Sequence, residues 1–594
     1  MRAPGSFLTS SDADAPPAGF WLLLLALAIT VYAFGLGGQY VPTNGDELVY
    51  AHIARETAET GHWLPLASEL ADTRNTKPPL LFWQAMVAGG WGEHWTLAAL
   101  RTPSLIYTLL LAAAVAWSVR LVTRRWRDGL IAACVYLAFL STFRYGRPYL
   151  TSAPETFWLS LPLFALLWQR LRSPGQGPGW GAHTLLGLAL GLGLAYKSFA
   201  LIAPAAAAWW AALALSEPRL SWRLLLRHSL RTAFSAALAL GVFALWFVLD
   251  PDPQGVWQEF IVAENAAKFR DPRSWWQAAF AFDGSSIWSQ LLAYAVNAGL
   301  LATAVLGLGW LGLRRLPALR RAPLPAHTAI LLAWSLVWLL VFLLPDQRSA
   351  RYVIPATPAV AMLLALHWRD IGRPWFIPGL LFSALALLMI GRIAWVSHAL
   401  ALTSTGEISA VLLTIGLGAL TIAAGLWRPV WTRAAAVTAP LLVYAAFNLT
   451  AAPLDGPVGR YAPQAAAALP GARIAVPNGF NSQFERFQFL LPGRHTFVPY
   501  ETEGRAIGRL APGASLQPPA QQLEQLLAAH DAVIWIQSSM EEDQPLCLPR
   551  CSVLGERWLL KSRHLPGEIT TGNLWYPQQW LFKREWLLAR PAPR

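Results

Sequence analysis

Charged residues are scarce in this sequence. Asp, Glu, Lys and Arg make up only 13% of its 594 residues, whereas 55% of the residues are hydrophobic. A soluble domain carries about 25% charged residues, so this composition excludes a chain that folds entirely in water. Apolar runs of about 20 residues, enough for a helix to cross the hydrocarbon core of a bilayer, recur along most of the chain. We therefore predict a polytopic α-helical membrane protein.

Several catalytic signatures are also absent. The sequence contains no HExxH, CxxC, GxSxG or P-loop pattern, which excludes the zinc proteases, serine hydrolases and ATP-driven enzymes that depend on them. No cofactor is expected, and the motifs give no support for a bound divalent metal. The net charge of +13 does not indicate a nucleic acid partner, because the arginines lie in short loops between apolar runs, where they orient a membrane protein.

Cysteine is rare, with three in the whole chain. Cys134 lies within an apolar run and is expected in the core. Cys547 and Cys551 lie close together in "CLPRC" near the C-terminus. They can pair if this end lies in an oxidising compartment, and an unpaired surface thiol pair is the alternative.

Arginines cluster in alternate loops, and this pattern predicts the topology. Thirteen spans are expected, with twelve or fourteen as alternatives: 20–38, 97–119, 129–143, 152–169, 183–196, 199–215, 230–249, 286–313, 327–345, 352–368, 375–396, 408–427 and 431–450. Because arginine and lysine favour cytoplasmic loops, residues 1–19 are placed in the cytoplasm. The outer face then holds loops 39–96 and 250–285. The first span has no small-residue cleavage site and is expected to be retained.

Residues 451–594 differ in composition from the apolar region 20–450. They contain short alternating runs such as "ARIAVPNG", "HTFVPY" and "DAVIWIQSS", with a helical "PAQQLEQLLAAH" between them. Such alternation is typical of strands. We predict a small α/β domain on the outer side.

Acids and lysines stand where the predicted spans meet the outer face. Asp46 and Glu47 open a helical stretch, and Glu47 fits a capping box with Asn44, which leaves Asp46 to point into a site. Lys77 precedes two prolines and is therefore held in extended geometry; it either snorkels to the interface or binds a phosphate. Lys197 lies between two apolar segments, where an ionisable side chain indicates function.

Further cations gather on the same face, in short outer loops: Arg144, Arg147, Lys268, Arg270, Arg348 and Arg351. The tendency of positive charge to remain in the cytoplasm does not explain them. They indicate a polyanionic ligand at the outer surface.

Several stretches together resemble one known family, the bacterial relatives of the lipid A aminoarabinose transferases and protein O-mannosyltransferases, which are GT-C glycosyltransferases. The resemblance covers roughly residues 20–370 and lies in "GDELVYAHIARE", "TGHWLPL", "TKPPLLFW", "RTPSLIYTLLL", "AYKSFALIAP", "ENAAKFRD" and "RYVIPATPAVAMLLA". In the tail, "FERFQFLLPGRH" is similar to the small periplasmic domain of that family.

The resemblance implies a GT-C fold in the bacterial inner membrane, with a C-terminal periplasmic α/β domain. It also implies inverting transfer of a sugar from a polyprenyl-phosphate (undecaprenyl phosphate) donor to a lipid, glycan or protein on the periplasmic side, as in lipopolysaccharide modification. By matching motifs, Asp46 and Glu47 are the expected catalytic acids. The expected donor-phosphate ligands are Lys77, Lys197, Arg270, Arg351 and Tyr352, and the expected sugar or acceptor contacts are Arg147, Glu155, Glu264 and Asn265.

The sequence also departs from the family pattern. Leu48 and Val49 stand where the lipid A-modifying members tend to have an arginine, Thr76 replaces an acid, and Ser152 replaces another, with Glu155 one turn on. These departures weaken the expectation of the metal site of some relatives and of lipid A as acceptor. The alternative function is a non-enzymatic flippase or transporter of a lipid-linked sugar. Such carriers usually have discontinuous helices in paired halves, whereas this chain concentrates its charge at one face.

Overall fold

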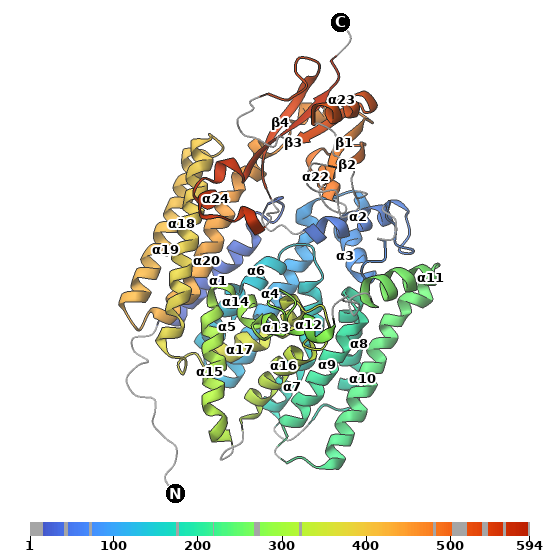
Figure 1. Cartoon of the computed structure of the whole chain (residues 1–594). Helices are drawn as coiled ribbons and strands as arrows, with labels where there is room; N and C mark the ends of the chain where they lie inside the picture. The colour runs from blue at the N-terminus through green and yellow to red at the C-terminus, as the bar shows by residue number, and fades with distance from the viewer. Residues whose placement is uncertain are drawn as a thin grey trace.

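A bundle of helices carries a small β-sheet domain at one end (Figure 1). The structure is a computed structural model that describes residues 16–40, 45–69, 74–173, 177–217, 219–266, 274–319, 324–478, 483–501, 519–536, 544–561 and 566–591. The last long helix of the bundle, α20 (Thr432–Ala451), leads directly toward the sheet domain.

The predicted polytopic α-helical architecture is confirmed. The bundle contains α1 (Ala18–Ala33), α4 (Leu97–Thr123), α5 (Trp126–Ala138), α7 (Ser152–Arg172), α8 (Trp180–Tyr196), α9 (Ile202–Leu215), α10 (Trp222–Leu249), α15 (Ala302–Leu319), α16 (Ala326–Val341), α17 (Thr357–Leu366), α18 (Ile377–Ala399), α19 (Thr405–Trp427) and α20. A helix therefore lies on each predicted range. Within the described residues, six helices are long and apolar enough to cross a membrane, and five apolar helices are shorter. The number of spans stays a prediction.

One predicted span is interrupted. The range 286–313 contains α13 (Ile287–Leu291), α14 (Ala293–Ala298) and the start of α15 in place of one continuous helix. Gly299, between α14 and α15, has φ +61°, a left-handed conformation that glycine adopts without strain. A Cβ atom at this position would lie 2.5 Å from the Cβ of Leu140. The chain breaks its helix where it passes close to α6 (Leu140–Tyr145).

Buried polar contacts fasten the C-terminal end of α1 to the rest of the bundle. Asn448 of α20 donates a hydrogen bond to the carbonyl of Val31 at 2.8 Å. Its own side-chain oxygen accepts from Arg147 at 3.3 Å. Arg147 also donates to the carbonyls of Tyr32 and Phe34, at 2.9 and 2.6 Å. The last carbonyls of a helix lack partners within it, and here buried side chains supply them.

A layer of shorter helices, α2 (Gly45–Glu59) and α3 (Leu80–Ala88), lies between the bundle and the sheet domain (Figure 1). Both come from the predicted loop 39–96. The second predicted loop, 250–285, contains α11 (Pro253–Val256), the π-helix η3 (Trp257–Asn265) and α12 (Trp275–Phe280). Arg74 joins the two loops, because it forms ion pairs with Asp252 and Glu259.

The sheet domain contains five strands in the order β2-β1-β3-β5-β4. The strands are β1 (Arg473–Asn478), β2 (Thr496–Glu501), β3 (Ala532–Ile536), β4 (Ser552–Leu560) and β5 (Phe582–Ala589). Strands β2, β1 and β3 are parallel, whereas β5 is antiparallel to both β3 and β4. The predicted α/β domain is therefore present.

Alternate residues of the strands pack against different helices, as the two-residue period of a strand requires. Ile474 and Val476 of β1 face α21 (Pro463–Ala467) and α22 (Arg486–Leu490), in one apolar cluster with Phe487. Ala475 faces the opposite side, in the cluster that contains Leu523 of α23 (Pro519–Ala529). In Figure 1, α22 lies between the sheet and α2. A last short helix, α24 (Thr571–Trp575), lies beside α18.

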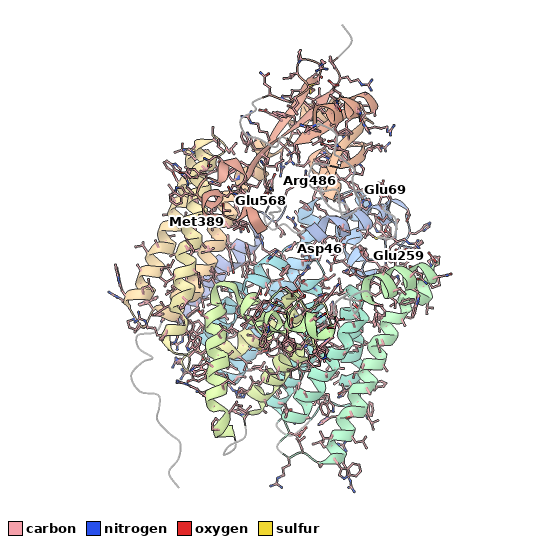
Figure 2. All side chains as sticks on the ribbon, in the orientation of Figure 1. Asp46, Glu69, Glu259, Met389, Arg486 and Glu568 are labelled. Carbon is pink, nitrogen blue, oxygen red and sulfur yellow. A yellow bond between two sulfur atoms is a disulfide. The ribbon has the colours of Figure 1, made fainter. Side chains whose placement is uncertain are left out.

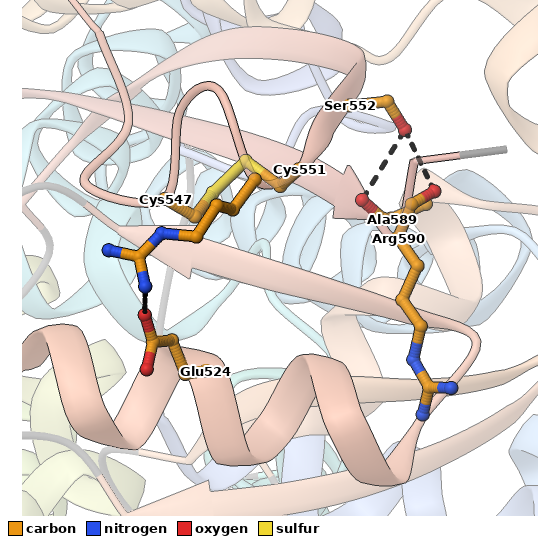
Figure 3. Close-up of a disulfide and its surroundings, with 7 residues drawn as sticks. Glu524, Cys547, Cys551, Ser552, Ala589 and Arg590 are labelled. Atoms are coloured by element: carbon orange, nitrogen blue, oxygen red, sulfur yellow. Dashed lines mark hydrogen bonds and ion pairs between the residues drawn. A yellow bond between two sulfur atoms is a disulfide. The ribbon is translucent and has the colours of Figure 1, made fainter. Parts of the chain in front are cut away.

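Cys547 and Cys551 form a disulfide, with their Cα atoms 5.6 Å apart. The bond closes a short loop on the α23 side of the sheet (Figure 3). Arg550 in this loop forms an ion pair with Glu524 of α23. Of the two possibilities that the sequence left open, the structure shows the paired cysteines. Cys134 is buried in the bundle core, as expected.

Candidate active site at the outer end of the bundle

The two adjacent acids at the start of α2 have different surroundings. Glu47 is 2% exposed and accepts two hydrogen bonds from Arg101 of α4, at 2.6 Å from Nε and 2.8 Å from Nη2. It also accepts from the backbone N–H of Tyr149 at 2.7 Å. Arg101 in turn donates to the carbonyls of Leu36 and Gly38. Glu47 therefore fastens the first turn of α2 to the bundle.

Asp46 points instead toward Arg351, on the short helix η6 (Ala350–Ala356). Its Oδ2 lies 3.1 Å from Nη1 of Arg351, and the two side chains are 36% and 34% exposed. The guanidinium also lies 4.8 Å from the centre of the Tyr145 ring. Figure 2 shows Asp46 at the boundary between the bundle and the sheet domain. Asn44, the expected capping residue, lies outside the described residues.

Lys77 is held at the entrance to α3, as its position before two prolines predicts. Its ammonium donates to the carbonyl of Thr76 at 2.7 Å and lies 2.8 Å from Oε1 of Glu264. Glu264 comes from the π-helix η3, a type of helix that occurs often at functional sites. Lys77 and Glu264 therefore bring the two predicted outer loops together.

Lys197 lies in a break between α8 and the short helix η2 (Phe199–Leu201). Its Nζ is 2.7 Å from Oε1 of Glu155, which is fully buried in the first turn of α7. Among the described residues, the other carboxylate oxygen of Glu155 has no hydrogen-bond partner. The next residue, Ser198, donates to Asn265 of η3 at 2.9 Å. The interruption between the two apolar segments is therefore what presents Lys197.

These pairs make one site. We name it the charged cluster, and its members are Asp46, Lys77, Glu155, Lys197, Glu264 and Arg351. The positive charges of Arg351 and Lys77 are near enough to repel the ammonium of Lys197. The charges of four cluster members, Asp46, Arg351, Glu264 and Glu155, all act on the phenol of Tyr50. Segments hundreds of residues apart therefore meet at the end of the bundle nearest the sheet domain.

The cations of the cluster keep hydrogen-bond donors that the protein does not use. An ammonium has three N–H groups and a guanidinium has five. Within the described residues, Lys77 uses two, Lys197 one and Arg351 one of these donors on side chains and carbonyls. Phosphate oxygens can therefore bind without displacing the carboxylates. The described residues contain no group of three or more His, Cys, Asp or Glu side chains that could hold a metal ion.

Sequence reasoning missed Tyr50. It lies one turn after Asp46 on the same face of α2, and its ring centre is 5.7 Å from Nζ of Lys77. Burial and the Asp46 carboxylate raise the pKa of the phenol well above its ordinary value, so the hydroxyl stays protonated. No hydrogen bond of this hydroxyl occurs among the described residues. The sequence did contain a signal for Tyr50. It lies four residues after Asp46, and this spacing places two side chains on one helix face.

Of the other expected site residues, some lie at the charged cluster and some do not. Tyr352 borders the cluster, with its ring centre 5.9 Å from Nζ of Lys197, and Asn265 reaches the cluster through Ser198. The structure does not bring Arg147 to the cluster, because its guanidinium is buried against the carbonyls at the end of α1. Arg270 lies outside the described residues.

The sheet domain holds α2 from the other side. Glu485, before α22, is fully buried and lies 3.1 Å from Nδ1 of His52. It also accepts hydrogen bonds from Nε and Nη2 of Arg55, at 2.8 and 3.0 Å. The helix that presents Asp46 is therefore clamped between Arg101 of the bundle and Glu485 of the sheet domain.

Comparisons with known proteins agree with this architecture. No protein-family model matches the chain. The fold is similar to ArnT from Cupriavidus metallidurans in the apo state, with a TM-score of 0.57 at 17% identity over 96% of this chain and 98% of that one. The same protein bound to undecaprenyl phosphate matches with a TM-score of 0.56. The chain therefore has the GT-C fold. The fold expected from the sequence is confirmed.

Curated relatives show the same resemblance in sequence. The chain is 30% identical to an undecaprenyl phosphate-alpha-4-amino-4-deoxy-L-arabinose arabinosyl transferase of Sodalis glossinidius, over 59% of this chain and 60% of the relative. It is 26% identical to the corresponding transferase of Pectobacterium carotovorum, over 58% of each chain. The chain thus spans about 60% of the length of the curated relatives it matches. The resemblance expected from the motifs is confirmed.

Replacing Glu47 should destabilise the fold. Glu47→Gln leaves the buried guanidinium of Arg101 without a countercharge, and breaking a buried pair in this way costs about 3–5 kcal/mol. We expect a clear drop in the unfolding temperature of the detergent-purified protein. The control is Glu59→Gln on the same helix, which removes a 59% exposed partner of Arg55 and should change little. Equal unfolding temperatures for the two variants would contradict this role of Glu47.

Replacing Glu485 should loosen α2. Glu485→Gln weakens the charged hydrogen bonds to Arg55, each worth about 1.5–3 kcal/mol, so amide hydrogen exchange in residues 45–59 should become about tenfold faster or more. Mass spectrometry of peptic fragments measures this rate. Glu524→Gln, which removes an exposed pair elsewhere in the sheet domain, is the control. Unchanged protection of α2 in Glu485→Gln would show that the clamp is not what orders this helix.

Proposed function

We propose that this protein is an inverting glycosyltransferase that moves a sugar from a polyprenyl-phosphate donor to an acceptor on the periplasmic side of the bacterial inner membrane. The observation that carries the proposal is the charged cluster. Arg351 pairs with the partly exposed Asp46 carboxylate at the end of an apolar helix bundle, and Lys77 and Lys197, which also keep unused N–H groups, belong to the same cluster. Such a site suits a phosphate whose hydrocarbon chain lies in the membrane.

The relatives support the choice of donor. The curated relatives are named for a sugar linked to undecaprenyl phosphate. The similar Cupriavidus metallidurans structure holds undecaprenyl phosphate itself. Because the chain matches only about 60% of the curated relatives' length, the aminoarabinose of their names is not carried over. We propose the lipid phosphate as the common feature and leave the sugar open.

The cations would act on the leaving group. Breaking the bond between C1 of the sugar and the phosphate oxygen moves an electron pair, and thus negative charge, onto the phosphate. Lys77, Lys197 and Arg351 would stabilise this charge where water is scarce and fixed charges act more strongly than in bulk solvent. The protonated phenol of Tyr50 is a further donor beside the charged cluster. We keep Arg270 as a proposed donor ligand on the family resemblance alone.

Asp46 would act on the acceptor. In a hydroxyl acceptor, its carboxylate takes the proton while the acceptor oxygen forms the new bond to C1 from the face opposite the phosphate, which inverts the configuration. Arg351, now 3.1 Å from Asp46, can orient the carboxylate with one N–H group and bind the phosphate with others. We assign Glu47 a positioning role, since its carboxylate is used by Arg101 and Tyr149. Glu155, Glu264 and Asn265 remain proposed neighbours of the sugar.

The proposed orientation rests on two observations. The arginine-rich turns between α4 and α5 and between α19 and α20 lie at the end of the bundle away from the sheet (Figure 1), and such turns favour the cytoplasm. The Cys547–Cys551 disulfide lies in the sheet domain, and disulfides persist in oxidising compartments such as the periplasm. We therefore propose residues 20–450 as the catalytic membrane unit and 451–594 as a periplasmic domain.

Removing the base should slow the reaction without unfolding the protein. We expect Asp46→Asn to lower turnover by about 10²–10⁴, the usual contribution of a general base, with little change in unfolding temperature because Asp46 is partly exposed. The measurement is product formation from a purified polyprenyl-phosphate sugar and membrane acceptor. Full turnover in Asp46→Asn would reject the assignment. Donor movement across liposomes without any product would favour the flippase.

Neutralising the Lys197 pair should weaken donor binding. The double variant Glu155→Gln/Lys197→Met removes both charges and so leaves no unpaired buried charge. We expect its affinity for undecaprenyl phosphate in detergent micelles, followed by thermophoresis, to fall about tenfold or more, because a charged hydrogen bond is lost.

The matched control for this variant is on the same helix. Arg170, at the other end of α7, forms a buried pair with Glu217. Arg170→Met/Glu217→Gln should have a similar effect on stability and none on donor affinity. Equal affinities in the two double variants would remove Lys197 from the donor site.

A further inference from the structure

A second group of charged side chains lies at the opposite end of the bundle from the charged cluster. Four packed helices, α7 to α10, bring it together (Figure 1). Arg170 lies near the end of α7, about 22 Å along that helix from Glu155 at the helical rise of 1.5 Å per residue. We name the group the basic cluster, and its members are Arg170, Glu217, His228, Arg231 and Thr232. None of them takes part in the proposed reaction.

One carboxylate serves all the cations of the basic cluster. Nη2 of Arg170 pairs with Oε1 of Glu217, which directly follows the end of α9. Nε2 of His228 lies 3.3 Å from the same oxygen. Arg231 donates to the carbonyl of Pro178 at 2.8 Å and forms no ion pair with a described residue. Both guanidinium groups act electrostatically on His228, so they lie close together, and the basic cluster carries an excess of positive charge.

Several buried polar atoms of the basic cluster lack a partner. In the part of the chain that the structure describes, no hydrogen bond is made by Nε and Nη1 of Arg170, Nδ1 of His228, Nε of Arg231 or the hydroxyl of Thr232. Arg170, His228 and Thr232 are only 5%, 3% and 5% exposed. Buried polar groups are nearly always hydrogen-bonded. Because most of these atoms are N–H or O–H donors, the missing partner supplies acceptor atoms and negative charge.

The basic cluster is closed toward the middle of the bundle. Its three α10 members share one helix face, because residues three and four apart lie on the same side of a helix. Ser235 continues this face, and its Oγ lies 3.0 Å from Nδ1 of His183 on α8. One turn later on α8, a Cβ added to Gly187 would lie 2.9 Å from the carbonyl oxygen of Ser235. Since α8 and α10 touch here, a partner reaches the basic cluster from the end of the bundle or from its lipid-facing side.

Outward-facing apolar side chains flank the basic cluster. The guanidinium of Arg231 lies over the ring of Trp180, 5.4 Å from its centre. Trp180 packs against Phe234 on α10, with the ring centres 5.5 Å apart. Both rings are exposed, as are Leu226 and Leu230. Such a surface on a membrane bundle contacts acyl chains, and indole rings favour the level of the headgroups. The excess positive charge therefore lies where lipid headgroups meet their chains.

We propose that the basic cluster binds the phosphate of an anionic phospholipid in the leaflet at this end of the bundle. Arg170 and Arg231 bind the phosphate oxygens through N–H groups that the protein leaves unused, as planar guanidinium groups do well. The hydroxyl of Thr232 adds a donor, and an acyl chain lies along the exposed ring of Trp180. Basic pockets between membrane helices bind phosphate headgroups in this way. The binding does not depend on the proposed transferase activity.

Native mass spectrometry of the full-length protein, released from detergent with increasing dioleoyl phosphatidylglycerol, measures the affinity for the first bound lipid. We expect Arg231→Gln/Thr232→Val to bind it about tenfold more weakly or less well still, because charged hydrogen bonds are lost. The charge-matched control is Arg314→Gln, which removes an exposed arginine of α15 and should bind normally. Unchanged affinity in Arg231→Gln/Thr232→Val overturns the proposal.

A second variant tests the other arginine and serves if the first does not fold. Arg170→Met/Glu217→Gln removes both charges of the buried pair and so leaves no unpaired charge, but it also removes the unused N–H groups of Arg170. Its affinity for phosphatidylglycerol should fall by a similar factor. Because a ligand that binds only the folded state stabilises it, phosphatidylglycerol should raise the unfolding temperature of the wild type and of Arg314→Gln more than that of either cluster variant. Equal stabilisation of all four proteins would contradict the site.

Two comparison probes separate the possible sources of the phosphate. Glycerol 3-phosphate has the phosphate without the chains and should bind at least about tenfold more weakly than phosphatidylglycerol, since burial of acyl chains adds affinity. Equal affinity would overturn the assignment of a lipid and indicate a site for a soluble phosphate. Dioleoyl phosphatidylcholine should also bind more weakly, because its choline cation is repelled by the arginines. Equal affinity for phosphatidylcholine would overturn the requirement for an anionic lipid.

Discussion

The buried ion pair between Glu47 and Arg101 is the contact on which the geometry of the site depends. Taking a carboxylate and a guanidinium out of water is costly unless each satisfies the other, and here both side chains are almost fully buried. The pair fixes the first turn of α2 against α4, and Tyr149 adds a backbone hydrogen bond. Asp46 is the preceding residue, so its direction toward Arg351 follows from the anchoring of Glu47.

The requirement that a charge removed from water meets an opposite charge also applies across the charged cluster. Lys77, Lys197 and Arg351 each pair with one carboxylate, which allows three cations to stand close together in a partly buried site before any ligand arrives. Such preorganised charge needs no rearrangement when negative charge develops on a phosphate. The cluster draws on segments distant in sequence, since six side chains on one helix face are spread along the helix and cannot surround a single point.

The sheet domain takes part in this arrangement through α2. Glu485 contacts His52 and Arg55 about two turns beyond Asp46, so the sheet domain holds the helix on one side and the bundle holds it on the other. A change in the sheet domain can therefore reach Asp46 through one rigid helix.

The sequence by itself determined the membrane-spanning class, the helical ranges and the α/β tail, and it predicted Asp46, Lys77 and Lys197 as candidate site residues, because hydrophobic runs and isolated ionisable residues among them are local signals. Only the tertiary structure decided which charges meet. It gave Glu47 and Asp46 different partners, placed Arg147 at the end of α1, interrupted the span at Gly299 where Leu140 approaches, and placed Tyr50 beside the charged cluster. These outcomes depend on contacts between segments far apart in the chain, whose desolvation and packing energies leave no mark in local composition.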